Sequence, residues 1–385
     1  MLEYIKMKGK IKKTSEIEGI ISISGKGTGY VRAKGEINKD ESIEIDHSFL
    51  NTALHGDTVR VILHAFRKGY RQSGEVKEVL TRSKAGFSGV LEAENGIYFL
   101  LPSDTRMYTD ILIPQEKLNS AKPGEKVFGV ITSWTDSKKA PEGEIIKILG
   151  LPGENDAEMT GIALEKGFSS DFPEDVEKEA KNLKAKREED MKAEIKKRRD
   201  FRQILTFTVD PDDAKDFDDA ISFVELPNGH FEIGIHIADV SHYVKPGTAL
   251  DREAARRGTS VYLVDRTIPM LPEALSNDLC SLNPEEDKLT MSAVFDMDKE
   301  GKVRKEWFGK TVIHSNKRFS YEEAQKVLDD GGGVYFHELK ILNDLAKKLT
   351  KKRFAEGAIS LDQEEVKFEL DEKGKRIIIR DAKDK

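Results

Sequence analysis

An acidic loop lies between two strand-like apolar segments in the stretch Ile204-Leu-Thr-Phe-Thr-Val-Asp-Pro-Asp-Asp-Ala-Lys-Asp-Phe-Asp-Asp-Ala-Ile-Ser-Phe-Val224. Six aspartates fall within the ten residues 210–219. Carboxylates crowded onto one loop repel one another and raise each other's pKa, and a bound divalent cation removes that conflict. Because hard oxygen ligands of this kind suit Mg²⁺ or Mn²⁺, the stretch predicts a metal-dependent active site for phosphoryl chemistry.

The spacing of the aspartates predicts which of them share a metal site. In an extended segment, side chains two positions apart share a face, so Asp216 and Asp218 point one way and Phe217 points into the core. Asp210 ends the first strand and Asp219 starts the second. Carboxylate-bound ions hydrolyse phosphodiesters by activating water and stabilising the leaving oxygen. The predicted ligands of one or two such ions, and the predicted catalytic residues, are Asp210, Asp216, Asp218 and Asp219.

Two non-catalytic interpretations of the acidic stretch compete with a metal site. An EF-hand calcium loop needs Gly at its sixth position and Glu at its twelfth, but here these are Lys215 and Ile221. A solvated acidic turn is the common outcome for an arbitrary acidic cluster. The embedded Phe217 and the apolar strands on both sides disfavour it, although Asp212 and Asp213 at the outer turn are expected to face water.

Length and composition indicate two or three soluble domains. The chain has 385 residues, of which 35% are charged and 38% hydrophobic. Its formal net charge of −7 argues mildly against a nucleic-acid partner, although five lysines make residues 6–13 basic. Neither a signal peptide nor a membrane segment of roughly 18 apolar residues is visible in the sequence. The single cysteine, Cys280, has the surroundings of a buried side chain, excludes an internal disulfide and fits a reducing cytoplasm.

The first 150 residues contain a weak internal repeat. Glu18-Gly-Ile-Ile-Ser-Ile23 resembles Ser88-Gly-Val-Leu-Glu-Ala93, and the segments that follow each of them are also similar. Short alternating runs broken by Gly, Asn and Asp are typical of small β-barrels. We therefore predict two tandem five-stranded barrels of the OB (cold-shock) type, at residues 1–83 and 84–150.

The pattern changes after residue 150 to mixed helix and strand. Residues 174–202 are dense in Glu and Lys and predict a solvated helix, so that 151–203 forms a charged helical connection. Residues 204–385 predict an α/β catalytic domain.

A hairpin is predicted directly after the acidic loop, with its turn at Pro227-Asn228-Gly229. Apolar residues alternate strictly in its second strand, so one face of that strand is expected to be core. These residues are Phe231, Ile233, Ile235 and Ile237. The later elements are expected to be helices near 249–257, 321–329 and 338–356, and a strand pair at 365–370 and 376–380.

A glycine-rich stretch, Gly25-Lys-Gly-Thr-Gly-Tyr-Val31, resembles the nucleic-acid-binding strand of cold-shock barrels. In that interpretation Tyr30 stacks on a base and Lys26 meets a phosphate. Thr28 stands where an aromatic residue is usual, which weakens the stacking. An ordinary hairpin with a packed tyrosine explains the same residues equally well, so both interpretations stand.

Two further motifs allow a functional and a structural interpretation. In His236-Ile-Ala-Asp-Val-Ser-His242 the polar residues have the spacing of metal ligands on a helix, but the segment is strand-like. We therefore expect His236, Asp239 and His242 to be structural hydrogen-bonding residues. Tyr262 fits either the core or a base-stacking surface, and its apolar neighbours favour the core.

Three long motifs, in this order, make the chain similar to the ribonuclease II/ribonuclease R family. They are Thr208-Val-Asp-Pro-Asp-Asp-Ala-Lys-Asp-Phe-Asp-Asp-Ala220, Gly234-Ile-His-Ile-Ala-Asp-Val-Ser-His-Tyr-Val244 and Ile268-Pro-Met-Leu-Pro-Glu-Ala-Leu-Ser-Asn-Asp-Leu-Cys-Ser-Leu282. The family shares its exoribonuclease fold with the catalytic subunit of the exosome. Two cold-shock-type barrels before the catalytic domain agree with the ribonuclease R branch, and the resemblance covers essentially the whole chain.

The resemblance implies processive 3′-to-5′ hydrolysis of single-stranded RNA to nucleoside 5′-monophosphates by a monomeric, cytoplasmic enzyme that requires Mg²⁺. It carries the catalytic and metal-binding roles onto the four aspartates named above. Tyr262 aligns with the aromatic residue that packs against the 3′-terminal nucleotides, and Tyr321 aligns with another residue near the RNA end. The family's second stacking aromatic is expected near Gly357-Ala-Ile-Ser-Leu361 or at Phe368.

The chain also departs from the family pattern. Family members continue through the rest of the catalytic domain, which includes an arginine-bearing motif, and then into a C-terminal OB barrel. Some also carry an N-terminal helical domain. We therefore expect a fragment that holds most of the metal site and is inactive, or nearly so, by itself. Two alternatives remain: a non-catalytic RNA-binding protein with a degenerate or truncated nuclease domain, and a small-molecule Mg²⁺ phosphohydrolase, which the barrels disfavour.

Overall fold

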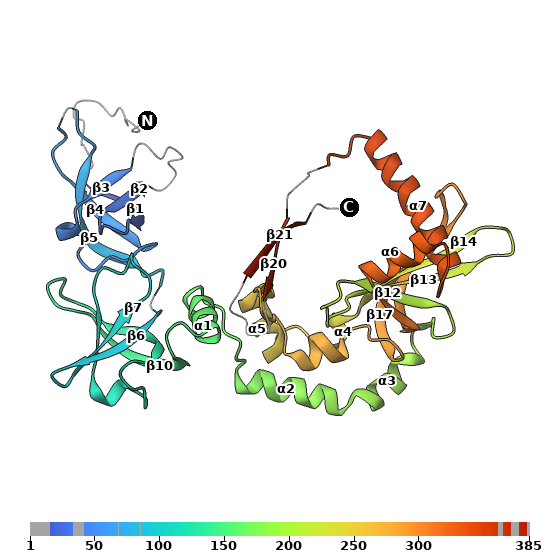
Figure 1. The fold of residues 1–385 in the computed structure, drawn as a ribbon, viewed down its shortest axis with the longest axis horizontal. Helices are drawn as coiled ribbons and strands as arrows, with labels where there is room; N and C mark the ends of the chain where they lie inside the picture. Colours follow the sequence, from blue (N-terminus) through green and yellow to red (C-terminus); the bar gives the residue numbers. More distant parts are fainter. Residues whose placement is uncertain are drawn as a thin grey trace. The chain divides into compact units, whose positions relative to one another are not determined.

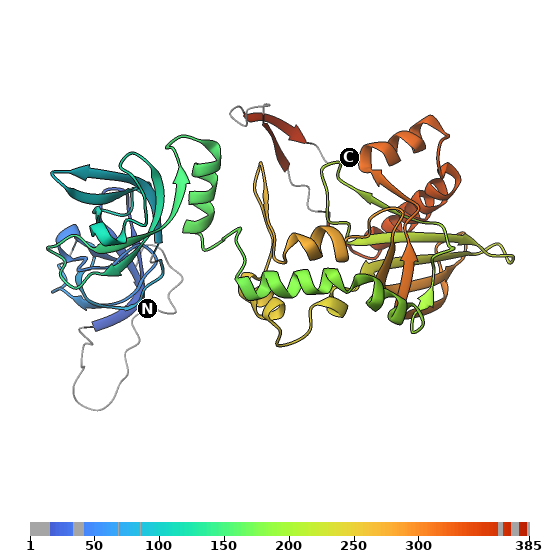
Figure 2. The same ribbon diagram turned by 90° about the horizontal axis from the view of Figure 1, so that it is seen from below.

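The computed structural model describes residues 16–33, 42–67, 69–84 and 86–360, together with the backbone of 365–370 and 377–382. The chain divides into two compact units, residues 1–169 and 170–385 (Figures 1 and 2). Among the described residues, no helix has both the length and the apolar character needed to cross a membrane.

The first unit contains two closed five-stranded barrels (Figure 1). The first barrel has the strand order β1-β2-β3-β5-β4, and the second repeats it as β6-β7-β8-β10-β9. This confirms the prediction of two tandem OB-type barrels. The strands are β1 (Glu16–Ile23), β2 (Gly29–Ala33), β3 (Ile43–Ile45), β4 (Thr58–Leu63), β5 (Ser73–Thr81), β6 (Gly86–Glu94), β7 (Ile97–Pro102), β8 (Ile111–Ile113), β9 (Lys126–Ser133) and β10 (Glu142–Gly150).

The repeated glycine of the two barrels has the same packing environment in each. A Cβ atom at Gly19 would lie 1.9 Å from the carbonyl oxygen of Arg32, and one at Gly89 would lie 1.9 Å from that of Leu101. Both neighbours belong to the strand that pairs with the glycine's own strand. Only glycine allows the two backbones to approach this closely, which explains the sequence repeat.

The two barrels pack against each other within the first unit. Leu54 of the first barrel is buried among the core side chains of the second barrel. Tyr108 of the second barrel contacts both cores, and its hydroxyl donates a hydrogen bond to the carbonyl of Ala53 at 2.9 Å. The two barrels therefore share apolar and polar contacts.

Helix α1 (Asn155–Glu165) packs on the second barrel. The Glu165 carboxylate accepts hydrogen bonds from the backbone N–H and the hydroxyl of Ser88, at 2.8 and 2.9 Å. It also forms an ion pair with Lys84 at 2.9 Å. These contacts place α1 in the first unit, which extends to Ser169.

The second unit is built on a seven-stranded sheet with the order β11-β18-β17-β14-β13-β12-β19. The strands from β18 to β12 are antiparallel to their neighbours, whereas the edge strands β11 and β19 join in parallel. The strands are β11 (Arg199–Asp200), β12 (Thr206–Asp210), β13 (Asp219–Glu225), β14 (Phe231–Ala238), β17 (Asp287–Met297), β18 (Val303–His314) and β19 (Lys317–Ser320).

Helices cover both faces of this sheet (Figure 1). On one face, Ala220 and Ala238 of the sheet share a core with residues of α2 (Glu174–Ala185), of α5 (Ala249–Arg257) and of a π-helix (Ala274–Leu279). On the other face, Phe223 and Phe207 pack with residues of α7 (Phe336–Ala355). The remaining elements are α3 (Arg187–Ile195), α4 (Val240–Tyr243), α6 (Tyr321–Asp330) and the strand pairs β15 (Val261–Tyr262) with β16 (Thr267–Ile268) and β20 (Glu365–Leu370) with β21 (Ile377–Ala382).

Most of the predicted elements of this unit are present near their expected bounds, but the single helix expected over 174–202 is wrong. Two helices, α2 and α3, replace it, and Arg199–Asp200 pair with β18 instead. The guanidinium of Arg198 is fully buried against Asp239, at 2.8 Å. This buried ion pair ties the segment that follows α3 to the sheet.

The expectation that one face of β14 forms the core was incomplete. Phe231 and Ile233 are buried as expected, but Ile237, on the same face, is 47% exposed. The opposite face is buried as well, because His236 and Ala238 point into the other helical layer. A sheet with helices on both faces buries residues that strict alternation assigns to solvent.

Candidate metal-binding and active site

The acidic loop connects two neighbouring strands of the sheet. As predicted, Asp210 is the last residue of β12 and Asp219 is the first of β13. Phe217 is only 7% exposed and belongs to the main core of the unit, which confirms its inward orientation. Asp212 and Asp213 are exposed, also as predicted. Because the ring of Phe217 is buried in the core, the acidic loop is not a freely solvated turn.

Ser281 holds the second half of this loop. Its hydroxyl oxygen accepts a hydrogen bond from the N–H of Phe217 at 3.0 Å and donates one to the carbonyl of Lys215 at 3.0 Å. The N–H of Leu282 donates to the carbonyl of Phe217 at 2.9 Å, and that of Ala238 donates to the carbonyl of Asp218 at 2.9 Å. The second and third sequence motifs therefore support the first through backbone hydrogen bonds.

Arg318 holds the first half of the loop from β19. Its Nη2 atom donates to the carbonyl oxygens of Pro211 and Asp212, both at 2.7 Å. The guanidinium carbon also lies 5.6 Å from the ring centre of Phe217. Neither Arg318 nor Ser281 was identified from the sequence as a site residue, because both reach the loop from distant segments.

The four predicted ligands lie within electrostatic range of one another. Partial burial raises the pKa of Asp210, and the negative charges of Asp219 and Asp216 raise it further. Partial burial likewise raises the pKa of Asp218, together with the charges of the other three aspartates. A bound cation would offset the repulsion that Asp210 and Asp218 experience in their ionised forms, as expected of carboxylates at a metal site.

The donor chemistry of the loop fits a hard divalent cation. Asp210 Oδ2 is buried and has no hydrogen-bond partner, an unpaired state that coordination to a cation would relieve. Carboxylate oxygens are what Mg²⁺ and Mn²⁺ prefer. Within the described ranges, however, no group of three or more His, Cys, Asp or Glu side chains is arranged to hold an ion.

Two exposed tyrosines lie next to the acidic loop. Tyr262, on β15, is 68% exposed and its hydroxyl donates to Asp216 Oδ2 at 3.2 Å. The expectation of a core position for Tyr262 was therefore wrong: the short β15–β16 hairpin leaves the ring in solvent. Tyr321 is 56% exposed and follows Ser320, which pairs in register with Asp210. The structure thus brings both tyrosines to the same edge of the sheet as the aspartates.

Lys26 and Tyr30 belong to the first barrel. Lys26 is exposed in the turn between β1 and β2, where Gly27 has a φ of 82°. Tyr30 is half-buried on β2, with the guanidinium of Arg71 5.6 Å from its ring centre. Of the two segments proposed for the second stacking aromatic, Leu361 lies outside the described residues, and only the backbone of Phe368 is described, on β20.

His236 is a structural residue, as expected. It is fully buried, and its ring nitrogens lie 2.6 Å from the hydroxyl of Ser292 and 2.9 Å from that of Ser222. Burial lowers its pKa to about 4, so the ring is neutral.

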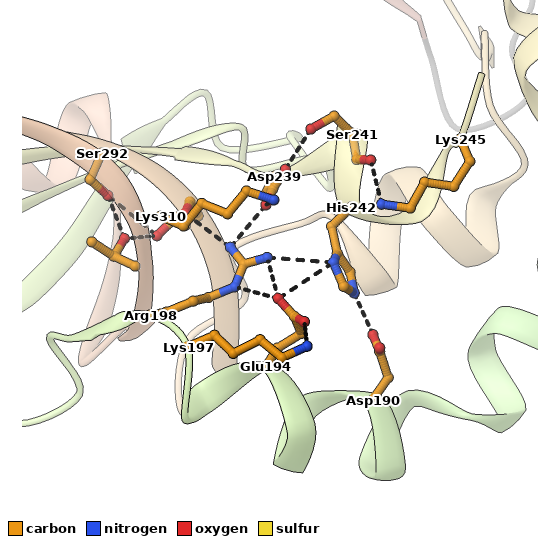
Figure 3. Close-up of polar contacts among 12 residues, drawn as sticks. Asp190, Glu194, Lys197, Arg198, Asp239, Ser241, His242, Lys245, Ser292 and Lys310 are labelled. Carbon is orange, nitrogen blue, oxygen red and sulfur yellow. Dashed lines mark hydrogen bonds and ion pairs between the residues drawn. The ribbon is translucent and has the colours of Figure 1, made fainter.

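Asp239 and His242 belong to an ion network that joins α3 to the sheet (Figure 3). Arg198 lies at its centre, within 2.8 Å of Asp239 and 3.0 Å of Glu194. The ring of His242 contacts Asp190 at 2.5 Å. These contacts explain both residues without a metal ion.

Comparison with known proteins identifies the family. A family model for the RNB domain matches residues 198–385, and a model for the cold shock domain matches residues 99–173. Ribonuclease R of Thermotoga maritima is 36% identical over 381 residues, which cover 97% of this chain and 53% of that protein. The chain belongs to the ribonuclease II/ribonuclease R family. It spans about half the length of this curated relative.

Solved structures of the family share the fold. Ribonuclease R of Mycoplasma genitalium, in complex with ribose-methylated single-stranded RNA, matches with a TM-score of 0.82 at 25% identity, covering 95% of this chain and 58% of that one. Yeast Ssd1, a pseudonuclease, matches with a TM-score of 0.61 at 20% identity, covering 89% of this chain and 49% of that one, and shows the fold alone. The ribonuclease II/ribonuclease R fold therefore accounts for the order of barrels and sheet described above.

Proposed function

We propose that this chain forms the acidic, metal-binding part of a 3′-to-5′ exoribonuclease that degrades single-stranded RNA. The observation that carries the proposal is the set of four mutually repelling aspartates at one edge of the RNB-domain sheet, with raised pKa values for Asp210 and Asp218. The finer parts of the proposal are a requirement for Mg²⁺, which Mn²⁺ can replace, processive action, nucleoside 5′-monophosphate products, and a monomer that acts in the cytoplasm.

Each site residue has a role in this proposal. The divalent ions would be held by Asp210, Asp216, Asp218 and Asp219, and when bound they activate water and stabilise the leaving oxygen. Tyr262 and Tyr321 present exposed rings beside the loop, where aromatic side chains can stack on the terminal bases of an RNA strand. On the first barrel, Lys26 would meet an RNA phosphate and Tyr30 would stack on a base.

The test uses the natural full-length protein and a 5′-labelled single-stranded RNA with Mg²⁺. We expect the labelled RNA to be converted to a short end product with few intermediates, as processive digestion from the 3′ end predicts, and chromatography of the released nucleotides to identify nucleoside 5′-monophosphates. Asp218→Asn should abolish hydrolysis while RNA affinity stays within about twofold, because it removes a ligand charge and keeps the side-chain shape. Unchanged turnover in Asp218→Asn would refute the role of Asp218.

A non-catalytic RNA-binding protein is the second candidate function. The observation that favours it is that, across the described part of the chain, no three carboxylates or imidazoles are arranged to hold an ion. This candidate predicts RNA binding without Mn²⁺ binding and without hydrolysis. Titration of the metal-free protein with Mn²⁺ alone, followed calorimetrically, separates the two functions.

A further inference from the structure

Arg318 is the cationic side chain that joins the two halves of the acidic loop. Its two 2.7 Å hydrogen bonds reach the carbonyls of Pro211 and Asp212, immediately after the predicted ligand Asp210. Its cation–π contact reaches Phe217, which lies between the predicted ligands Asp216 and Asp218. A planar guanidinium can make both kinds of contact at once, whereas a lysine ammonium has no planar face to lie on a ring.

The pairing of two strands places Arg318 beside the acidic loop, and its side chain is largely buried there. Strand β19 lies parallel to β12, with Arg318 in register with Thr208, two residues before Asp210. The side chain is only 23% exposed, and its Nε atom is buried without a hydrogen-bond partner. The two hydrogen bonds of Nη2 and the contact with the Phe217 ring therefore account for the orientation of the guanidinium.

The charge of Arg318 also acts on the site. It opposes the negative charges of Asp219 and Asp216 at Asp210. Its ion pair with Asp212, at 3.7 Å, is weak because that carboxylate is 88% exposed. The contribution of Arg318 that favours cation binding is thus its hold on the backbone, because its positive charge close to Asp210 opposes a second cation there.

We propose that Arg318 is a positioning residue, which fixes the backbone of the acidic loop beside the predicted ligands Asp210, Asp216 and Asp218 and so favours cation binding by them. This inference rests on the proposed function. Ser281 holds only residues 215–217, and Arg318 holds residues 211–212. Loss of Arg318 would leave the Pro211 carbonyl with the local hydrogen bond from the N–H of Ala214, at 3.1 Å, and would remove the tie between this half of the loop and β19. Residues that orient metal ligands typically contribute about 10–100-fold to metal affinity.

The test compares Arg318→Gln and Arg318→Lys with the control Arg304→Gln in the natural full-length protein. Gln keeps an amide donor without the charge, and Lys keeps the charge without the planar fork. Arg304 forms an ion pair with Asp298 at the other end of the sheet and serves as a matched arginine. Two readouts are measured: amide hydrogen exchange of residues 212–217 without metal, and calorimetric affinity for Mn²⁺ alone.

We expect faster exchange of the loop in Arg318→Gln and an affinity for Mn²⁺ lower by about 10-fold or more. Arg318→Lys should fall between this variant and wild type, and it carries the test if Arg318→Gln does not fold. Exchange and Mn²⁺ affinity equal to those of Arg304→Gln would overturn the inference. A third outcome is that Arg318→Gln speeds exchange of the loop while neither wild type nor any variant binds Mn²⁺. This outcome would support the positioning role and overturn the metal-dependent function.

Discussion

The hydroxyl of Tyr262 donates a hydrogen bond to Oδ2 of Asp216, at 3.2 Å, and so links an exposed aromatic ring to one of the predicted metal ligands. Partial burial, and then the negative charge of Asp216, raise the pKa of Tyr262 and keep the hydroxyl protonated as a donor. The ring itself stays free on the solvent side, with 68% of the residue exposed. One side chain therefore offers a stacking surface and an orienting hydrogen bond.

Tyr262→Phe separates these two contributions. The ring is kept and the hydroxyl is lost, so we expect RNA affinity within about twofold of wild type and Mn²⁺ affinity lower by up to about 10-fold, the value of one hydrogen bond to a charged group. Tyr262→Ala should lower RNA affinity in addition, because stacking contributes about 1–3 kcal/mol per base. Equal losses of RNA affinity in both variants would show that the hydroxyl, and not the ring, contacts RNA.

Ser281→Ala should destabilise the second unit. The residue is 1% exposed, and its loss leaves the N–H of Phe217 and the carbonyl of Lys215 without their hydroxyl partner. A buried unpaired polar group costs about 1–3 kcal/mol. Denaturant unfolding measures this cost, and Ser48→Ala, which removes an exposed hydroxyl contact, should change stability by less than about 0.5 kcal/mol. A Ser281→Ala protein as stable as the control would contradict the assigned role.

Asp218→Asn should make the metal-free protein more stable. The raised pKa of Asp218 means that its ionised form is disfavoured in the folded state above the folded pKa, and this penalty disappears as pH falls through that pKa. The amide removes the same penalty at neutral pH. We expect a gain of about 0.5 kcal/mol, kept small because solvent screens the repulsion.

The measurement is the thermal midpoint with and without Mg²⁺. Wild type should gain more from Mg²⁺ than Asp218→Asn does, since its full set of carboxylates binds the ion. Asp213→Asn, at the exposed outer turn, is the matched control and should resemble wild type. A lower midpoint for metal-free Asp218→Asn would argue against carboxylate repulsion in the loop.

His236 should make the folded state sensitive to acid. Its folded pKa of about 4 lies below the ordinary value of 6.5, so the unfolded chain binds a proton first as pH falls. Stability from this residue is complete above pH 6.5 and is lost between pH 6.5 and about 4, at about 1.4 kcal/mol per pH unit. His236→Asn should reduce the slope of unfolding free energy against pH in this window. An unchanged slope would assign the acid sensitivity to other groups.

Local sequence patterns predicted much of this protein, because they report on interactions between neighbours in the chain. The repeated glycines Gly19 and Gly89 mark two barrels with the same strand order. The alternation around Phe217 correctly places its ring in the core and Asp216 and Asp218 outside. In an extended backbone, alternate side chains point to opposite sides, so this pattern can be predicted from the local sequence alone.

The tertiary structure alone decided how the acidic loop is held. Arg318 reaches Pro211 across 107 positions of sequence, and Ser281 reaches Phe217 across 64, so no local pattern records either contact. The exposure of Tyr262 and the burial of His236 also depend on which elements cover them. The sequence by itself shows which carboxylates are available to bind a cation. Packing between distant strands determines whether the backbone that carries these carboxylates is fixed in position.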